Sequence, residues 1–257
     1  MTRSMETHWL EQTEADLPAH DDWLSPDEAV LLSRMRFAKR RADWRLGRWT
    51  AKRAVAACLN LPDPHALREI EVRPAPSGAP QVFVRNRFAA VTISISHRAG
   101  VAVCAIVMGG AQLGCDLELI EPRDGSFVAD YFTSEEQESI SRAPEEDRPR
   151  LVTVLWSAKE STLKALRQGL RVDTRCVAVT LNTQTDHEHA AGGLRQYSEL
   201  DRWWPLQVRC AGGEIFHGWW QSTGLLVRTL VGSPSPLPPL FLKGCAVSDR
   251  SAGLAAV

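Results

Sequence analysis

The alternation of apolar and polar residues predicts a helical segment followed by short strands in the first half of the chain. Residues 26–60 follow Ser25-Pro26, a preferred helix start, and only Gly47 interrupts them before Leu61-Pro62 ends the segment. We therefore expect a helix there, broken at most once. Strands are predicted over five apolar runs separated by Gly and Pro signals: residues 69–73, 81–84, 91–96, 101–108 and 113–120.

The same order of elements begins again after residue 120. Thr133-Ser134-Glu135-Glu136 has the acids of a helix's first turn, and residues 148–170 form a long helical stretch. Further short strands are predicted at residues 175–181, 194–199, 206–210, 214–220 and 225–231. This repeated order predicts an α+β protein of two similar halves, although no repeat is visible at the level of single residues.

The domain boundaries follow from the same pattern. Residues 25–112 are predicted to form the first half and residues 113–231 the second half. Residues 1–24 read as an acidic N-terminal extension. Residues 232–257 begin with closely spaced prolines and continue with small and polar residues, which predicts a disordered tail outside the core.

Composition narrows the classes of protein to consider. Of 257 residues, 44% are apolar and 24% charged, as in ordinary soluble globular proteins. The 30 basic and 31 acidic residues give a net charge of -1, which argues against a nucleic-acid partner. The six cysteines are far apart, so we expect reduced thiols in a cytoplasmic protein. No signal sequence or apolar run long enough for a bilayer is visible, so no membrane partner is expected.

Charge is nevertheless segregated along the chain. Residues 1–28 hold eight acids and one base, whereas residues 34–53 hold nine bases and Asp43 alone. Five of these bases have spacings that would place them in one stripe of a helix: Arg34, Arg41, Arg45, Arg48 and Lys52. Such a row needs an anion opposite it. The charge pattern fits a bound phosphate and the acidic N-terminal segment equally well.

Two short segments carry candidate chemistry. Asp116 and Glu118 lie on one face of a predicted strand, and Glu160 and Lys164 lie on one face of a predicted helix. Taken separately, each pair has an ordinary alternative, a solvated strand face and a surface ion pair. Together, three carboxylates without a His or Cys cluster suit Mg²⁺ better than Zn²⁺, and Mg²⁺ implies a phosphorylated substrate.

Four segments, in this order, resemble the signature of the 4′-phosphopantetheinyl transferases, in particular the larger monomeric type that activates nonribosomal peptide and polyketide synthases. They are Ser94-Ile95-Ser96-His97, Gly114-Cys115-Asp116-Leu117-Glu118, Phe132-Thr133-Ser134-Glu135-Glu136 and Trp156-Ser157-Ala158-Lys159-Glu160-Ser161-Thr162-Leu163-Lys164. The resemblance spans residues 25–231. It implies a pseudo-twofold α+β monomer of two similar halves, with coenzyme A in the cleft between them.

Enzymes of this family move the 4′-phosphopantetheine arm of coenzyme A onto a serine of an apo acyl or peptidyl carrier protein and release adenosine 3′,5′-bisphosphate. The resemblance therefore implies a holo-[acyl-carrier-protein] synthase type of enzyme. Asp116, Glu118 and Glu160 would hold Mg²⁺ on the pyrophosphate. His97 would contact a phosphate of coenzyme A, and Lys164 would assist charge development. Glu160 or a metal-bound water would accept the serine proton.

The resemblance also assigns residues to coenzyme A binding: Arg48, Lys52, Gly78, Pro80, Ser96, His97 and Lys164. Ala79 stands where the family usually has Lys or Arg, so that loop offers no cation at this position. Two alternative functions use the same residues. One is a catalytically silent module that binds coenzyme A or a carrier protein, and the other is a metal-dependent phosphodiesterase or nuclease. The presence of all three acids and Lys164 favours the transferase.

Overall fold

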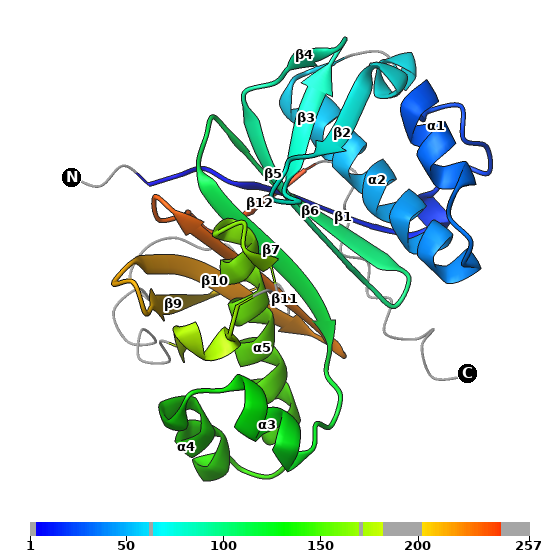
Figure 1. Cartoon of the computed structure of the whole chain (residues 1–257). Helices are drawn as coiled ribbons and strands as arrows, with labels where there is room; N and C mark the ends of the chain where they lie inside the picture. Colours follow the sequence, from blue (N-terminus) through cyan, green and yellow to red (C-terminus); the bar gives the residue numbers. More distant parts are fainter. Residues whose placement is uncertain (1–3, 62–63, 170–171, 182–201, 243–257) are drawn as a thin grey trace, which may run out of the picture.

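The structure, a computed structural model, describes residues 4–61, 64–169, 172–181 and 202–242. The protein is of mixed α/β type, and its helices form two groups along the chain with runs of consecutive strands after each (Figure 1). The N-terminal part contains β1 (His8–Thr13), η1 (Glu14–Asp16), α1 (Pro26–Ser33), α2 (Ala38–Cys58), η2 (Pro64–Glu69), β2 (Ile70–Pro74), β3 (Pro80–Val84), β4 (Arg87–Phe88), β5 (Val91–Arg98) and β6 (Val101–Met108).

The C-terminal part repeats the order of a strand, helices and further strands. It contains β7 (Gln112–Leu119), α3 (Gly125–Tyr131), α4 (Ser134–Arg142), α5 (Arg148–Ala165), η4 (Thr174–Cys176), β8 (Val177–Leu181), β9 (Trp204–Cys210), β10 (Ile215–Thr223), β11 (Leu226–Ser233) and β12 (Leu240–Phe241). Both predicted helix starts and most predicted strands are therefore confirmed. The strand predicted at residues 194–199 lies outside the described residues.

The helical segment 26–60 is broken once, at residues 34–37 and not at Gly47. Ser25 begins α1 with a capping box, in which its hydroxyl accepts a hydrogen bond from Glu28 N and the Glu28 carboxylate accepts one from Ser25 N. Gly47 lies in the buried part of α2, where packing against Ile95 of β5 supports the helix. Tertiary contact thus offsets the low helix propensity of glycine.

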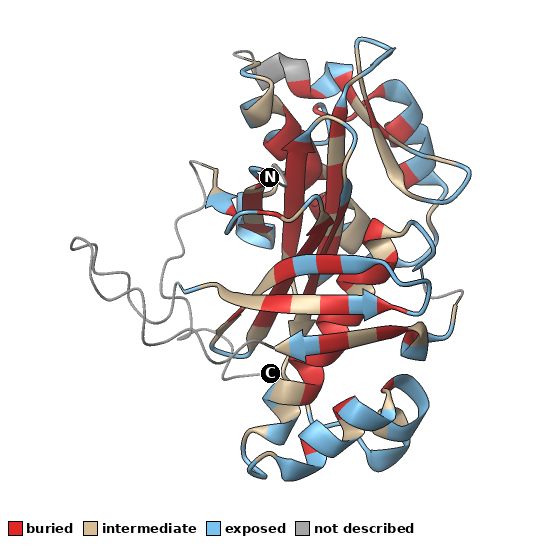
Figure 2. Ribbon diagram, turned by 90° about the vertical axis from the view of Figure 1, so that its left-hand side faces the viewer, coloured by how far each residue is buried: buried red, intermediate tan, exposed pale blue. Residues whose placement is uncertain are grey.

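Two larger sheets and one small sheet organise the strands. Their strand orders are β12-β1-β6-β5, β7-β11-β10-β9-β8 and β2-β3-β4. The two larger sheets meet at β5 and β7, where Ser94 Oγ accepts a hydrogen bond of 2.9 Å from Cys115 N. Helix α2 packs on β1 and β6, and α5 packs on β7 and β11. Figure 2 shows that burial is concentrated in the central strands and in the helix faces turned toward them.

The end segments contribute to the fold, in contrast to two predictions. Strand β1 pairs antiparallel with β6, and its Trp9 is fully buried, so residues 8–13 are part of the sheet. Strand β12 pairs parallel with β1, and Trp219 Nε1 donates a hydrogen bond of 2.9 Å to Pro236 O. The prediction of a disordered tail outside the core is therefore wrong for residues 232–242. Residues 243–257 lie outside the described part.

Within the described residues, the structure contains no helix with the length and apolar character needed to span a membrane.

Candidate active site

The three predicted acids come together where α5 packs on β7. Asp116 and Glu118 project from the same side of β7, and Glu160 projects toward them from α5. One carboxylate oxygen from each lies within 4.8 Å of the others. The structure thus brings the two acids of the strand and the acid of the helix into one acid cluster. Three carboxylates at this separation can bind one metal ion.

Hydrogen bonds fix the central member of the acid cluster. Asp116 is 1% exposed, and its Oδ1 accepts hydrogen bonds of 2.8 Å from Ser96 Oγ and from Lys164 Nζ. Its Oδ2 accepts one of 2.8 Å from Ser157 Oγ, which also lies 2.9 Å from Thr229 Oγ1. A carboxylate held by three donors keeps one orientation. Ser157 lies inside the sequence motif, but nothing in the local pattern indicated this role.

The electrostatics of the acid cluster favour a bound cation. Burial, and then the neighbouring Asp116 carboxylate, raise the pKa of Glu160 to about 7. The same two causes raise the pKa of Glu118, against the opposing effect of Arg98. Oxygen Oε2 of Glu118 is also buried without a hydrogen-bond partner, although Arg98 Nε lies 3.6 Å from it. Crowded, partly desolvated carboxylates fit Mg²⁺, which would relieve their mutual repulsion.

A pocket of about 750 Å³ adjoins the acid cluster. It is bounded by the α1 and α2 region, by the turn between β2 and β3, by β5 and by the end of α5. Five of the predicted binding residues line it: Arg48, Gly78, Pro80, His97 and Lys164. Lys164 belongs to both features, because it lines the pocket and its Nζ binds Asp116 Oδ1 and Cys115 O. The pocket and the acid cluster therefore meet at Lys164.

Two predicted binding residues do not line the pocket. Lys52 is fully buried, pairs with Glu28 and donates a hydrogen bond of 3.0 Å to Trp23 O. This burial is incompatible with its predicted contact to coenzyme A, because an ammonium group enclosed by these partners cannot reach a phosphate in the pocket. Ser96 is also buried, and its hydroxyl supports Asp116.

The predicted basic stripe is divided by the structure. Arg34 follows the end of α1 and does not belong to α2. Arg45 pairs with Asp21 and Lys52 with Glu28, so both bases form ion pairs with acids of the N-terminal segment. Arg48 differs from them, since it stacks over Trp44 at 4.7 Å and lines the pocket, although its Nε also lies 3.6 Å from Glu28 Oε1. Pairing with the acidic N-terminal segment is thus observed for Arg45 and Lys52, and phosphate binding stays a prediction for Arg48.

Several pocket residues were missed by sequence reasoning. They are Arg40, Trp44, Arg73 and Arg167. Arg40 carried a signal, since it belongs to the basic block, but its spacing falls outside the stripe. Arg73 and Arg167 lie at the ends of other elements, and only the fold brings them to the pocket.

Comparison with known proteins agrees with this geometry. A model described as the 4′-phosphopantetheinyl transferase superfamily matches residues 112–203, which include β7, α5 and the three acids. The chain is therefore similar to this superfamily over the part that carries the acid cluster. It is 27% identical over 165 residues to the protein named 4′-phosphopantetheinyl transferase HetI from Nostoc sp., and the match covers 63% of this chain and 67% of that relative.

A solved structure is also similar over part of the chain. It is the Helicobacter pylori holo-[acyl-carrier-protein] synthase in complex with coenzyme A, with 19% sequence identity and a TM-score of 0.32. The similarity covers 40% of this chain and 99% of that one. A likeness of this size does not define a shared fold.

Proposed function

We propose that the chain transfers the 4′-phosphopantetheine arm of coenzyme A to a serine of an apo acyl or peptidyl carrier protein. The observation that carries this proposal is the junction at Lys164 of a coenzyme-sized pocket and a cluster of three carboxylates. The named activity of the Nostoc relative supports it. A reaction at a pyrophosphate needs both a nucleotide pocket and a cation site, and Lys164 lies next to both candidates.

The residues have distinct roles in this reaction. Asp116, Glu118 and Glu160 would hold Mg²⁺, which supplies charge neutralisation at the pyrophosphate. The serine oxygen attacks the β-phosphorus, the bond to the bridging oxygen breaks, and adenosine 3′,5′-bisphosphate leaves. Lys164 is placed to stabilise the departing negative charge, and His97 on the pocket wall is placed to contact a phosphate. Glu160 is our candidate to accept the serine proton.

The remaining binding residues form the walls of the pocket. Arg48, stacked on Trp44, offers a guanidinium group to a phosphate. Gly78 has a φ of +88°, which favours glycine, and it shapes the turn that brings Pro80 to the pocket. We assign the nucleotide end of coenzyme A to this wall.

We further propose that the protein is a monomer of two halves related by a pseudo-twofold axis. In each half the first strand pairs antiparallel with a later one, β1 with β6 and β7 with β11. In each half a long helix packs on that pair, α2 on the first and α5 on the second. Coenzyme A would then lie between the halves.

The test is incubation of the chain with coenzyme A, Mg²⁺ and an apo carrier protein, followed by mass spectrometry of the carrier. We expect a mass gain of one phosphopantetheine, which Asp116→Asn abolishes and Glu138→Gln, on the exposed face of α4, leaves intact. Retained coenzyme A binding by Asp116→Asn would show that this variant is folded.

The alternatives give different results in the same assay. Coenzyme A binding without any mass gain on a panel of carriers would indicate a silent binding module. Cleavage of coenzyme A or of a nucleic acid without carrier modification would indicate a phosphodiesterase or nuclease.

A further inference from the structure

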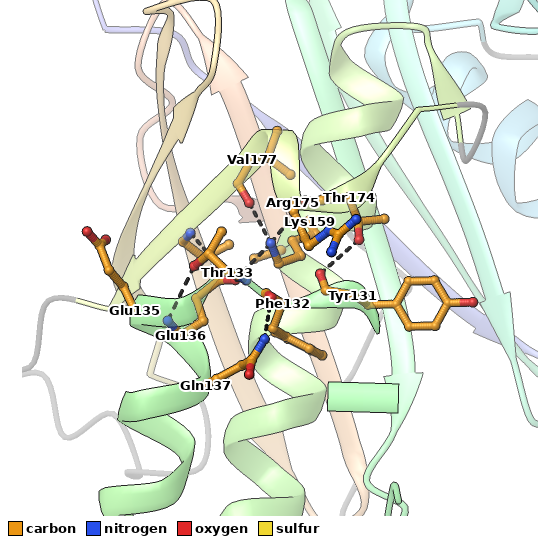
Figure 3. Close-up of polar contacts among 12 residues, drawn as sticks. Tyr131, Phe132, Thr133, Glu135, Glu136, Gln137, Lys159, Thr174, Arg175 and Val177 are labelled. Carbon is orange, nitrogen blue, oxygen red and sulfur yellow. Dashed lines mark hydrogen bonds and ion pairs between the residues drawn. The ribbon is translucent and has the colours of Figure 1, made fainter. Parts of the chain in front are cut away.

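Lys159 lies on the same helix as the acid Glu160, directly before it, but its side chain points into the core. It is fully buried, and its Nζ donates hydrogen bonds to Thr174 O at 3.0 Å and to Val177 O (Figure 3). The same Nζ lies 2.9 Å from Glu136 Oε2. The second oxygen of Glu136 accepts a hydrogen bond of 2.8 Å from Val179 N. This arrangement ties the start of α4, the middle of α5 and strand β8 together.

The first half contains the same arrangement around Lys52. This lysine is fully buried, pairs with Glu28 Oε2 and donates a hydrogen bond of 3.0 Å to Trp23 O. The second oxygen of Glu28 accepts a hydrogen bond of 3.3 Å from Val72 N. Here the start of α1, the middle of α2 and strand β2 are tied together.

The correspondence extends to the details of both networks. Glu28 and Glu136 are each the third residue of their helix and close a capping box, with Ser25 and Thr133 respectively. The glutamate and the strand amide that it binds are separated by 44 residues in one half and by 43 in the other. Each lysine ammonium lies 5.6 Å from the centre of an aromatic ring. This is a residue-level repeat that the sequence alone does not reveal.

Stability does not explain why both halves keep a buried ion pair. Taking two charges out of water costs about as much as their attraction returns, so apolar residues of similar size are often as stable. A buried pair does, however, define one geometry, since any displacement of the helix leaves a charge without its partner. Each pair therefore joins one long helix to a neighbouring helix start and strand, α5 to α4 and β8 and α2 to α1 and to β2 of the small sheet.

Each long helix carries a different part of the proposed site close to its buried lysine. On α5 the residue after Lys159 is Glu160, a member of the acid cluster. On α2 the residue one turn before Lys52 is Arg48, whose Nε lies 3.6 Å from Glu28 Oε1. Arg48 also donates a hydrogen bond to Val72 O, the strand residue that Glu28 binds.

We propose that Lys159 and Lys52 are positioning residues, one for each side of the site. The pair of Lys159 with Glu136 sets Glu160 for the metal, and the pair of Lys52 with Glu28 sets Arg48 for coenzyme A. This inference rests on the proposed function. It places Lys159 of the Trp156 to Lys164 segment and Lys52, the lysine of the basic stripe, in the interior, where neither contacts a substrate.

Each lysine substitution serves as the control for the other, because each removes a buried ion pair between a lysine and a glutamate. In Lys159→Met we expect Mg²⁺ affinity, measured by calorimetry, to fall roughly 10-fold to 100-fold, the range for residues that support metal ligands. The kcat should fall with it, while the dissociation constant for coenzyme A stays within about two-fold of wild type, since Arg48 is held independently by Glu28. In Lys52→Met we expect the reverse split, with weaker coenzyme A binding and unchanged Mg²⁺ affinity.

A merely structural role predicts a different result. Both variants would then lose Mg²⁺ and coenzyme A affinity together, in proportion to their loss of melting temperature, and this would overturn the proposal. The double variants Lys159→Met/Glu136→Gln and Lys52→Met/Glu28→Gln remove both charges and should fold where a single variant does not. They should show the same split. Failure of the double variants to fold would identify the pairs as folding requirements and would also overturn it.

The experiments distinguish failure of the positioning proposal from failure of the transferase proposal. Both affinities are measured without a carrier protein, so a wild-type chain that modifies no carrier contradicts the transferase proposal alone. A wild-type chain that modifies the carrier, with variants that show no split, contradicts the positioning proposal alone.

Discussion

The carbonyl oxygen of Ser161 on α5 lies 1.8 Å from the point where a Cβ atom on Gly114 of β7 would stand. No side chain fits between them, so the main chain of α5 rests directly on the main chain of β7. Asp116 is two residues after Gly114, and Glu160 directly precedes Ser161. The distance between strand and helix therefore determines whether the carboxylates meet.

Gly114→Ala should separate α5 from β7 and pull the acid cluster apart. We expect destabilisation of about 1 to 3 kcal/mol from overpacking, together with a marked loss of Mg²⁺ affinity by calorimetry. Gly110→Ala is the matched control, since a Cβ there meets no atom within 4 Å. Unchanged Mg²⁺ binding in Gly114→Ala would show that the acids do not depend on this close approach.

Glu160 should make the stability of the metal-free protein depend on pH. Its folded pKa of about 7 lies above the ordinary value of 4.5, so the folded state binds the proton more tightly than the unfolded state. The stability that this tighter proton binding adds to the folded state is fully present below about pH 4.5 and is lost as pH rises through 7. In EDTA, Glu160→Gln should therefore be more stable than wild type above pH 7, on the order of 1 to 3 kcal/mol.

Urea unfolding at a series of pH values measures this difference. The gap between variant and wild type should close near pH 4.5. Saturating Mg²⁺ should narrow the gap at high pH, because it stabilises only the protein that binds it. Parallel stability curves across this range would contradict the assignment of a raised pKa to Glu160.

The sequence predicted the parts of the site that depend on local geometry. The alternation of a strand places Asp116 and Glu118 on one side, and helical spacing places Glu160 and Lys164 on one face. That these two faces meet depends on contacts between distant segments, which local patterns do not encode. The family resemblance supplied that step.

Two predictions differ from the structure because contacts between distant segments were missed. The family resemblance assigned Lys52 to coenzyme A and helical spacing placed it in the basic stripe, but its partner Glu28 lies on another helix. Residues 232–242 were assigned to a tail because of their prolines. Their backbone nevertheless pairs with β1, where Leu240 N donates a hydrogen bond of 2.9 Å to Thr7 O. Both contacts become visible only in the folded chain.

Arg48 should contribute to coenzyme A binding through a phosphate. We expect Arg48→Ala to raise the KM for coenzyme A roughly 10-fold to 100-fold, the effect of removing one charge-assisted contact. If the contact is to the 3′-phosphate, dephospho-coenzyme A should be affected much less. Arg53→Ala is the control, because Arg53 lies on the same helix, exposed, over Trp49 and away from the pocket lining. Equal loss for both substrates, with a lowered melting temperature, would assign Arg48 to the scaffold.

Arg228 and Glu11 connect the two halves through a bidentate ion pair. Arg228 on β11 is 5% exposed, and its Nε and Nη2 donate hydrogen bonds of 2.6 Å to the two carboxylate oxygens of Glu11 on β1. Arg228→Met removes the guanidinium and leaves the Glu11 carboxylate in a largely buried place. Breaking a buried pair in this way costs about 3 to 5 kcal/mol, which we expect as the loss in free energy of unfolding.

The pair of Arg142 with Glu138 on the surface of α4 provides the comparison. Its arginine side chain is 73% exposed, so Arg142→Met should cost less than about 1 kcal/mol. Substituting both members, Arg228→Met with Glu11→Leu, should recover part of the loss, because the buried carboxylate is then removed together with the guanidinium that compensates its charge. Urea unfolding of the three variants measures the loss in free energy of unfolding for each of them. A loss in Arg228→Met no larger than that in Arg142→Met would mean that other contacts hold β1 against β11, and that this ion pair does not determine how the two halves are joined.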